Sequence, residues 1–170
     1  MLRRKSKKDM EDFRGRMKWH YVLAYCFLWI SAFSYFSNFA KTRSSRLFTT
    51  DDPKIQQQLD VLVLRNPGIK TAASVYGIGC LILAVIAIVA AIGLIKFRRF
   101  GIYALLIGDF IAICNTGMYM SEINKAVSNS NNMKAVSGIL SMSTSGGILI
   151  SVILIVLNII YFSKRIHLYN

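Results

Sequence analysis

The sequence predicts an all-α integral membrane protein, an antiparallel bundle of four transmembrane helices with both termini in the cytoplasm and a short amphipathic helix on the extracytoplasmic side. Two observations predict this fold. The chain has 170 residues, 54% of them hydrophobic, and the apolar residues form continuous runs of about twenty, the length of a membrane-spanning helix. The net charge is +13, and the cations flank the apolar runs, as expected of residues that set topology.

Four apolar runs are expected to form the spans of one transmembrane domain over residues 19–163. These spans are residues 19–39, 71–95, 101–120 and 146–162. Outer loops occupy residues 40–70 and 121–145, and cytoplasmic tails occupy residues 1–18 and 164–170. The third helix is expected to continue past the membrane to Val127, and residues 133–145 would form a protruding hairpin if they are helical.

Positive charge is densest in two segments, which we therefore expect to face the cytoplasm. The expected location of the protein is the plasma membrane. These cations also suit contact with anionic lipid head groups. They are distributed over separate loops, so we expect no nucleic-acid interface. The cations are Arg3, Arg4, Lys5, Lys7 and Lys8 in the first tail, and Lys96, Arg98 and Arg99 in the turn after the second span.

The first outer loop contains the amphipathic helix. Asp52 and Pro53 make a favourable helix start, because Asp caps free N–H groups and Pro suits the first helical position. Ile55, Leu59 and Leu62 follow as one apolar stripe, and the segment 66–68, Asn-Pro-Gly, is expected to stop the helix. Such a helix could cap the bundle, lie on the bilayer, or dock a partner.

Small residues along the second span predict close helix packing. They recur at alternating steps of four and three, which keeps them on one face. In lipid, small side chains allow helix backbones to approach closely. We therefore expect this span to be the central packing helix, with a seam formed by Ala73, Gly77, Cys80, Ala84, Ala87 and Ala91.

The third span contains one acid, Asp109, near its middle. A charge at that depth costs roughly 2.5–3.5 kcal/mol, so it normally faces protein or water. At 1.5 Å of rise per residue, Asp109 lies about 12 Å from the inner edge, Asn158 about 8–9 Å and Tyr25 about 9–11 Å. We therefore expect Asn158, a tyrosine hydroxyl or both to meet Asp109.

A second polar layer is expected nearer the outside, at roughly 18–22 Å from the inner edge. Its side chains could line a water-filled vestibule or form hydrogen bonds between helices. The layer comprises Ser31, Ser34, Asn115, Thr116 and Ser151.

Two interpretations of Asp109 remain open. Bonded to Asn158, or protonated, it would join helices and contribute about 0.6–2 kcal/mol. Alternatively, it is a functional proton, cation or ligand site, the default hypothesis for an acid within a membrane.

Signatures of enzymes, metals and cofactors are missing from the sequence. It contains no GxSxG, HExxH, P-loop or GxGxxG motif and no paired carboxylates. The three cysteines fall one per span, and His20 and His167 have no companion at metal-ligand spacing, so we expect neither disulfides nor zinc.

Two functions follow as hypotheses. The first is a non-enzymatic membrane protein that acts through helix or outer-loop contacts with partner membrane proteins, or as a homo-oligomer, in a subunit, regulator or immunity-type role. The second is a small transporter or ligand-binding bundle that uses Asp109 and the outer polar layer. The single acid and the lack of an inverted repeat weigh against a self-sufficient transporter.

Overall fold

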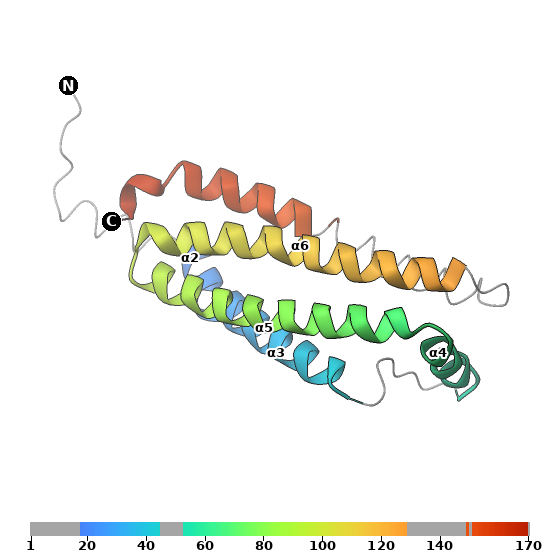
Figure 1. The fold of residues 1–170 in the computed structure, drawn as a ribbon. Helices are drawn as coiled ribbons and strands as arrows, with labels where there is room; N and C mark the ends of the chain where they lie inside the picture. The colour runs from blue at the N-terminus through green and yellow to red at the C-terminus, as the bar shows by residue number, and fades with distance from the viewer. Residues whose placement is uncertain (1–17, 45–52, 129–148, 150, 170) are drawn as a thin grey trace, which may run out of the picture.

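The computed structural model describes residues 18–44, 53–128, 149 and 151–169. This part of the chain is helical and contains no strand. Three of its helices are long and apolar enough to cross a membrane: Lys18–Thr42, Pro67–Ile95 and Arg99–Lys125. A shorter apolar helix, Ser151–Ser163, lies alongside α6 (Figure 1).

The first long helix changes type along its length. It consists of α2 (Lys18–Val22), the π-helical segment η1 (Leu23–Phe27) and α3 (Leu28–Thr42). A π segment bonds i to i+5 and so delays the helical phase. The buried face consequently passes from Ala24 to Leu28, whereas Phe27 is exposed. A regular helical spacing would place Phe27 on the same face as Ala24, and the π segment moves it off that face.

Helix α4 (Pro53–Arg65) precedes α5 (Pro67–Ile95) with only Asn66 between them. Asn66 has φ −124° and ψ 83°, outside the helical region, and Pro67 then occupies the start of α5. Proline fits there because its missing N–H would have no partner in the first turn. The expected stop at residues 66–68 is therefore a one-residue break, and α5 begins before the predicted span.

Helices α5 and α6 (Arg99–Ser128) form a hairpin with a short turn. Phe97 adopts φ 50°, and the turn bonds run from Phe97 N to Leu94 O at 2.9 Å and from Arg98 N to Gly93 O at 2.9 Å. This is a Schellman cap, whose left-handed position is usually glycine. Here it is phenylalanine, and its ring stacks on His20 at 4.3 Å between centroids.

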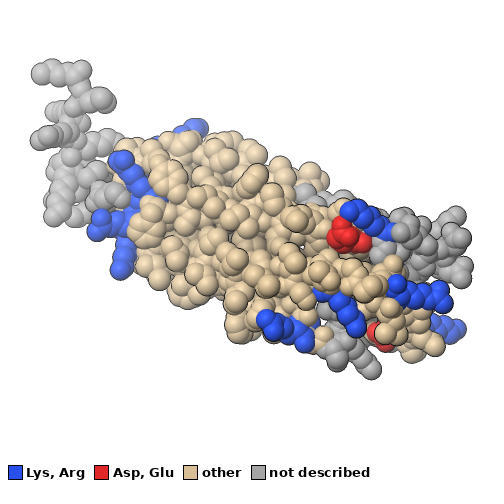
Figure 2. All heavy atoms as spheres, in the orientation of Figure 1, with Lys and Arg blue, Asp and Glu red and all other residues tan. Residues whose placement is uncertain are grey.

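The helices pack in sequence: α3 against α5, and α5 against α6. All six small residues of the expected α5 seam are buried. On the visible face, Lys and Arg gather at the left end, and on the right they extend from the tip back along the lower edge (Figure 2). A broad area without charged side chains lies between these two groups. That distribution suits a body surrounded by hydrocarbon.

The end of the chain folds back onto the hairpin turn. A short 3₁₀ helix, η2 (Ile166–Leu168), follows the last apolar helix, and both Leu168 and Tyr169 are only 1% exposed. The backbone oxygen of Tyr169 accepts a hydrogen bond from Arg99 Nε at 3.0 Å. Leu168 and Tyr169, which the sequence assigned to a cytoplasmic tail, are thus packed against the helices.

Several expectations lie outside the described residues. These are the basic tail with Arg3, Arg4, Lys5, Lys7 and Lys8, the possible hairpin at 133–145, and the first residues of the fourth span.

Candidate functional site

The structure brings Asp109 and Asn158 together. Asn158 Nδ2 donates a hydrogen bond to Asp109 Oδ2 at 3.3 Å, linking α6 to the helix Ser151–Ser163. Asn158 is 4% exposed, and its Oδ1 atom is buried without a hydrogen-bond partner. A buried amide oxygen without a partner is unusual, because desolvation normally costs about 1–3 kcal/mol.

A small cavity adjoins Asp109 on its other side, between α3, α5 and α6. Its volume is about 30 Å³, and its polar lining residues are Ser31, Tyr35 and Asp109. A site of this size holds a water molecule when polar groups face it. Asp109 therefore contacts the Asn158 amide and also lines a small cavity whose other lining residues are mostly apolar.

The tyrosine at this site is Tyr35, whereas the sequence pointed to Tyr25. Tyr25 is 54% exposed and its ring stacks on Tyr21 at 6.0 Å. Counting residues gave Tyr25 a matching depth, but depth does not specify which face of a helix a residue occupies.

Depths along the first long helix have to be counted from a different starting level than the sequence analysis used. His20 stacks on Phe97, so α2 begins level with the hairpin turn. From His20 to Ser31 is then about 16 Å along the helix, and from Arg99 to Asp109 about 15 Å. Ser31 therefore lies at the same depth as Asp109, although the sequence analysis had assigned Ser31 to a separate layer nearer the outside.

The expected outer polar layer does not share one cavity. Ser31 lines the cavity at Asp109, and Ser34 is exposed. Asn115 instead faces α5, where its Nδ2 donates to the Tyr76 backbone oxygen at 3.2 Å and approaches Cys80 Sγ at 3.9 Å. Thr116 and Ser151 are partly buried. Asn115 thus joins α5 and α6.

Sequence reasoning missed a buried aromatic cluster at the hairpin end. Tyr169 OH and His20 Nδ1 are 2.7 Å apart, and the Tyr169 ring also packs on Phe97 and Phe162 at 5.5 and 5.9 Å. His20 is fully buried. A histidine at a membrane edge beside aromatic residues was the only available signal, because its partner is 149 residues away in the chain.

Metal chemistry has no obvious set of ligands here. Among residues 18–44, 53–128 and 151–169, no group of three or more His, Cys, Asp or Glu side chains could hold a metal ion.

Neither a protein family, nor a curated protein, nor a solved structure matches the chain.

Proposed function

We propose that this chain is a non-enzymatic, multi-pass protein of the cytoplasmic membrane that acts through contacts with a partner membrane protein. In this proposal the four apolar helices span the bilayer as an antiparallel bundle, and both termini face the cytoplasm. The role is that of a subunit or regulator of a larger complex, or of an immunity-type protein. Support comes from the apolar helices and from a surface on α4.

The observation that carries the proposal is that α4 has apolar residues on two opposite faces. Leu59 is 7% exposed and packs within the chain, whereas Val61 and Leu64 are 40% and 74% exposed. These two lie about 200° and 140° around the helix from Leu59. Because α4 is not one of the helices long and apolar enough to span a membrane, contact with a partner protein is the cover that we propose for this second apolar face.

The experiment is affinity purification of the full chain from native membranes. The wild-type chain should retain one stoichiometric membrane protein. The double variant Val61→Ser, Leu64→Ser should lose it, whereas Gln58→Ser, an exposed polar truncation on the same helix, should keep it. Repeated purification of the wild-type chain alone would contradict the proposal, as would retention of the partner by the double variant.

The arrangement at Asp109 favours a second candidate function, a proton or cation site. Asn158 Nδ2 donates to Asp109 Oδ2, a bond that suits an ionised carboxylate. If the amide turned over, a protonated Asp109 could instead donate to Asn158 Oδ1, the atom that has no partner. The two amide orientations thus suit the two protonation states, and the adjoining cavity could admit water.

Reconstitution in liposomes tests this alternative. A proton-conducting protein should dissipate an imposed pH gradient, and Asp109→Asn should abolish the flux while the protein stays folded. The matched control is Asp60→Asn on α4. If the wild-type protein carries no flux, and both Asp109→Asn and Asp109→Leu only lower the thermal stability in detergent, Asp109 joins helices and has no transport role.

A further inference from the structure

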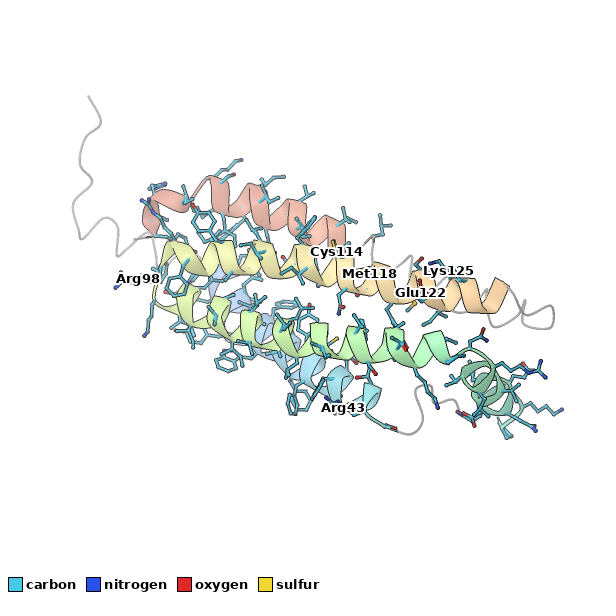
Figure 3. The ribbon with its side chains drawn as sticks, in the orientation of Figure 1. Arg43, Arg98, Cys114, Met118, Glu122 and Lys125 are labelled. Atoms are coloured by element: carbon cyan, nitrogen blue, oxygen red, sulfur yellow. The ribbon has the colours of Figure 1, made fainter. Side chains whose placement is uncertain are left out.

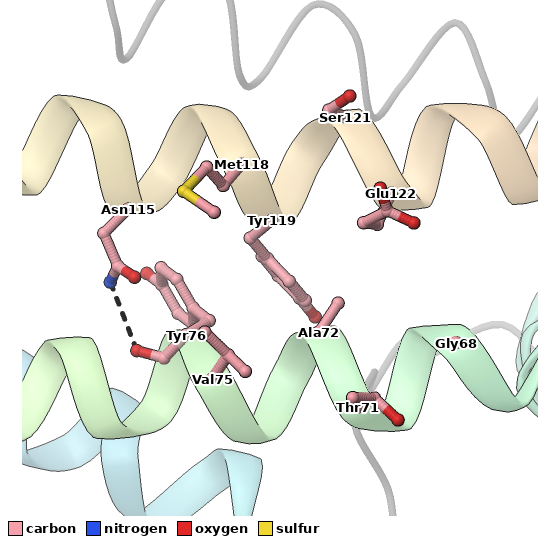
Figure 4. Close-up of a pocket in the computed structure, with 10 residues that line it drawn as sticks. All are labelled: Gly68, Thr71, Ala72, Val75, Tyr76, Asn115, Met118, Tyr119, Ser121 and Glu122. Atoms are coloured by element: carbon pink, nitrogen blue, oxygen red, sulfur yellow. Dashed lines mark hydrogen bonds between the residues drawn. The ribbon is translucent and has the colours of Figure 1, made fainter.

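A larger cavity lies between α5 and α6 at the end far from the hairpin turn (Figure 4). Its volume is about 490 Å³, within the range of small-molecule sites, roughly 300–1,000 Å³. It is also about three times the volume of an apolar cavity that holds benzene, roughly 150 Å³. The cavity is open on one side, so lipid or water from the surroundings has access to it.

The cavity follows from how the two helices diverge. Near the turn, Gly93 and Gly101 bring the backbones into contact. Farther out, the Asn115 side chain lies over Gly79, and the rings of Tyr76 and Tyr119 stack at 4.6 Å between centroids. These groups hold the helices apart, and the small residues Gly68 and Ala72 on α5 do not fill the space beyond them.

The lining is apolar along the length of the cavity and polar at its ends. Ala72, Val75, Met118 and the two tyrosine rings form the walls, Asn115 lies at the deep end, and Glu122 lies at the outer end. From Asn115 to Glu122 is about 10 Å along α6. The Asn115 amide already donates to the Tyr76 backbone oxygen, and the only charged side chain of the lining is Glu122. A cavity with a charge at one end and apolar walls matches an amphiphile whose head lies at the membrane surface and whose chain enters the bilayer.

The outer end also carries charges that suit a head group. Glu122 and Lys125 form an ion pair at 2.6 Å, with side chains 45% and 68% exposed. Both lie on α6 beyond Met118, toward the end of the helix farthest from Arg98 (Figure 3). A carboxylate beside an ammonium group complements a zwitterionic head, with its own ammonium at Glu122 and its phosphate at Lys125.

We propose that this cavity holds one acyl chain of a membrane lipid with an ethanolamine-type head, whose ammonium group binds Glu122. The chain lies against the rings of Tyr76 and Tyr119. This inference goes beyond the partner role and is independent of it, because the cavity is formed by α5 and α6 without α4.

Native mass spectrometry of the full chain in mild detergent tests the proposal, with phosphatidylethanolamine and phosphatidylglycerol added separately. The wild-type protein should form a one-to-one adduct with phosphatidylethanolamine, roughly tenfold tighter than with phosphatidylglycerol, the change expected from one charge-assisted hydrogen bond. Ala72→Phe fills the cavity and should abolish the adduct. Val85→Phe, on an exposed position of the same helix, should retain it.

Glu122→Gln separates head-group recognition from chain binding and leaves the helix intact. It should bind both lipids alike, whereas Asp60→Asn should still discriminate between them. Equal binding of both lipids to the wild-type protein overturns the proposal, as does the absence of any adduct. An adduct that survives in a folded Ala72→Phe protein also overturns it. If Ala72→Phe does not fold, the Glu122→Gln result decides.

Discussion

Adding one methyl group at Gly101 should destabilise the protein, although alanine is the better helix former. No described glycine has a positive φ, so Gly101 serves close approach and not an unusual backbone conformation. A Cβ atom there would lie 2.6 Å from both the Gly93 carbonyl carbon and the Leu94 nitrogen. These are backbone atoms that cannot rotate away, so α5 and α6 would have to separate.

The magnitude follows from two opposing effects. Overpacking costs about 1–3 kcal/mol, and rigid backbone neighbours favour the upper end of that range. Replacing glycine by alanine in a helix returns about 1 kcal/mol. Gly101→Ala should therefore lower the free energy of unfolding by about 2 kcal/mol.

Gly117→Ala is the matched control on the same helix. A Cβ atom at Gly117 has no heavy atom within 4 Å, so this variant should be neutral or more stable by up to about 1 kcal/mol. The assay is SDS titration of detergent-solubilised protein, followed by circular dichroism. Equal stability of the two variants, or a more stable Gly101→Ala, would refute the predicted contact between the hairpin backbones.

Two further predictions concern the hairpin end and the topology. Tyr169→Phe should lower the free energy of unfolding by about 1–3 kcal/mol, because it leaves buried His20 Nδ1 without the hydroxyl that lies 2.7 Å away. In the same titration, Tyr103→Phe at an exposed position should change the free energy of unfolding little. Equal effects of the two variants would show that the hydroxyl contact contributes nothing. The topology can be tested by cysteine labelling in a chain whose three native cysteines are replaced by Ser. An impermeant maleimide applied to intact cells should label Lys125→Cys and not Arg98→Cys. The reverse pattern would show that the proposed orientation is inverted.

The sequence predicted the features that composition alone determines. Continuous apolar runs produce long helices because a backbone in lipid must satisfy its own hydrogen bonds. The α5 seam from Ala73 to Ala91 was recognisable because small residues repeat at a helical spacing, and all its members are buried. The meeting of Asp109 with Asn158 was also within reach, since few polar groups lie deep in the apolar runs.

The features that sequence reasoning missed depend on contacts between distant segments. Tyr35 and not Tyr25 lies beside Asp109 because of the face that the first long helix turns toward α5. The π segment Leu23–Phe27 alters which residues occupy that face. The relative depth of the helices was set wrongly because the stacking of His20 on Phe97, which fixes the level of α2, joins residues 77 positions apart. No local pattern encodes such a level.

The two ends of the α5–α6 hairpin differ for one physical reason, the size of the side chains between the helices. Near the turn, paired glycines leave no space, and the aromatic cluster around His20 covers that end. Toward the other end, Asn115 and the stacked tyrosines hold the helices apart and leave a large cavity. Tight packing resists movement, since interiors are close-packed, whereas a cavity can be filled or emptied. Binding should therefore act on the half of the hairpin far from the turn, while the half near the turn stays fixed. Any ligand-dependent change would then lie beside α4, the helix proposed to contact a partner.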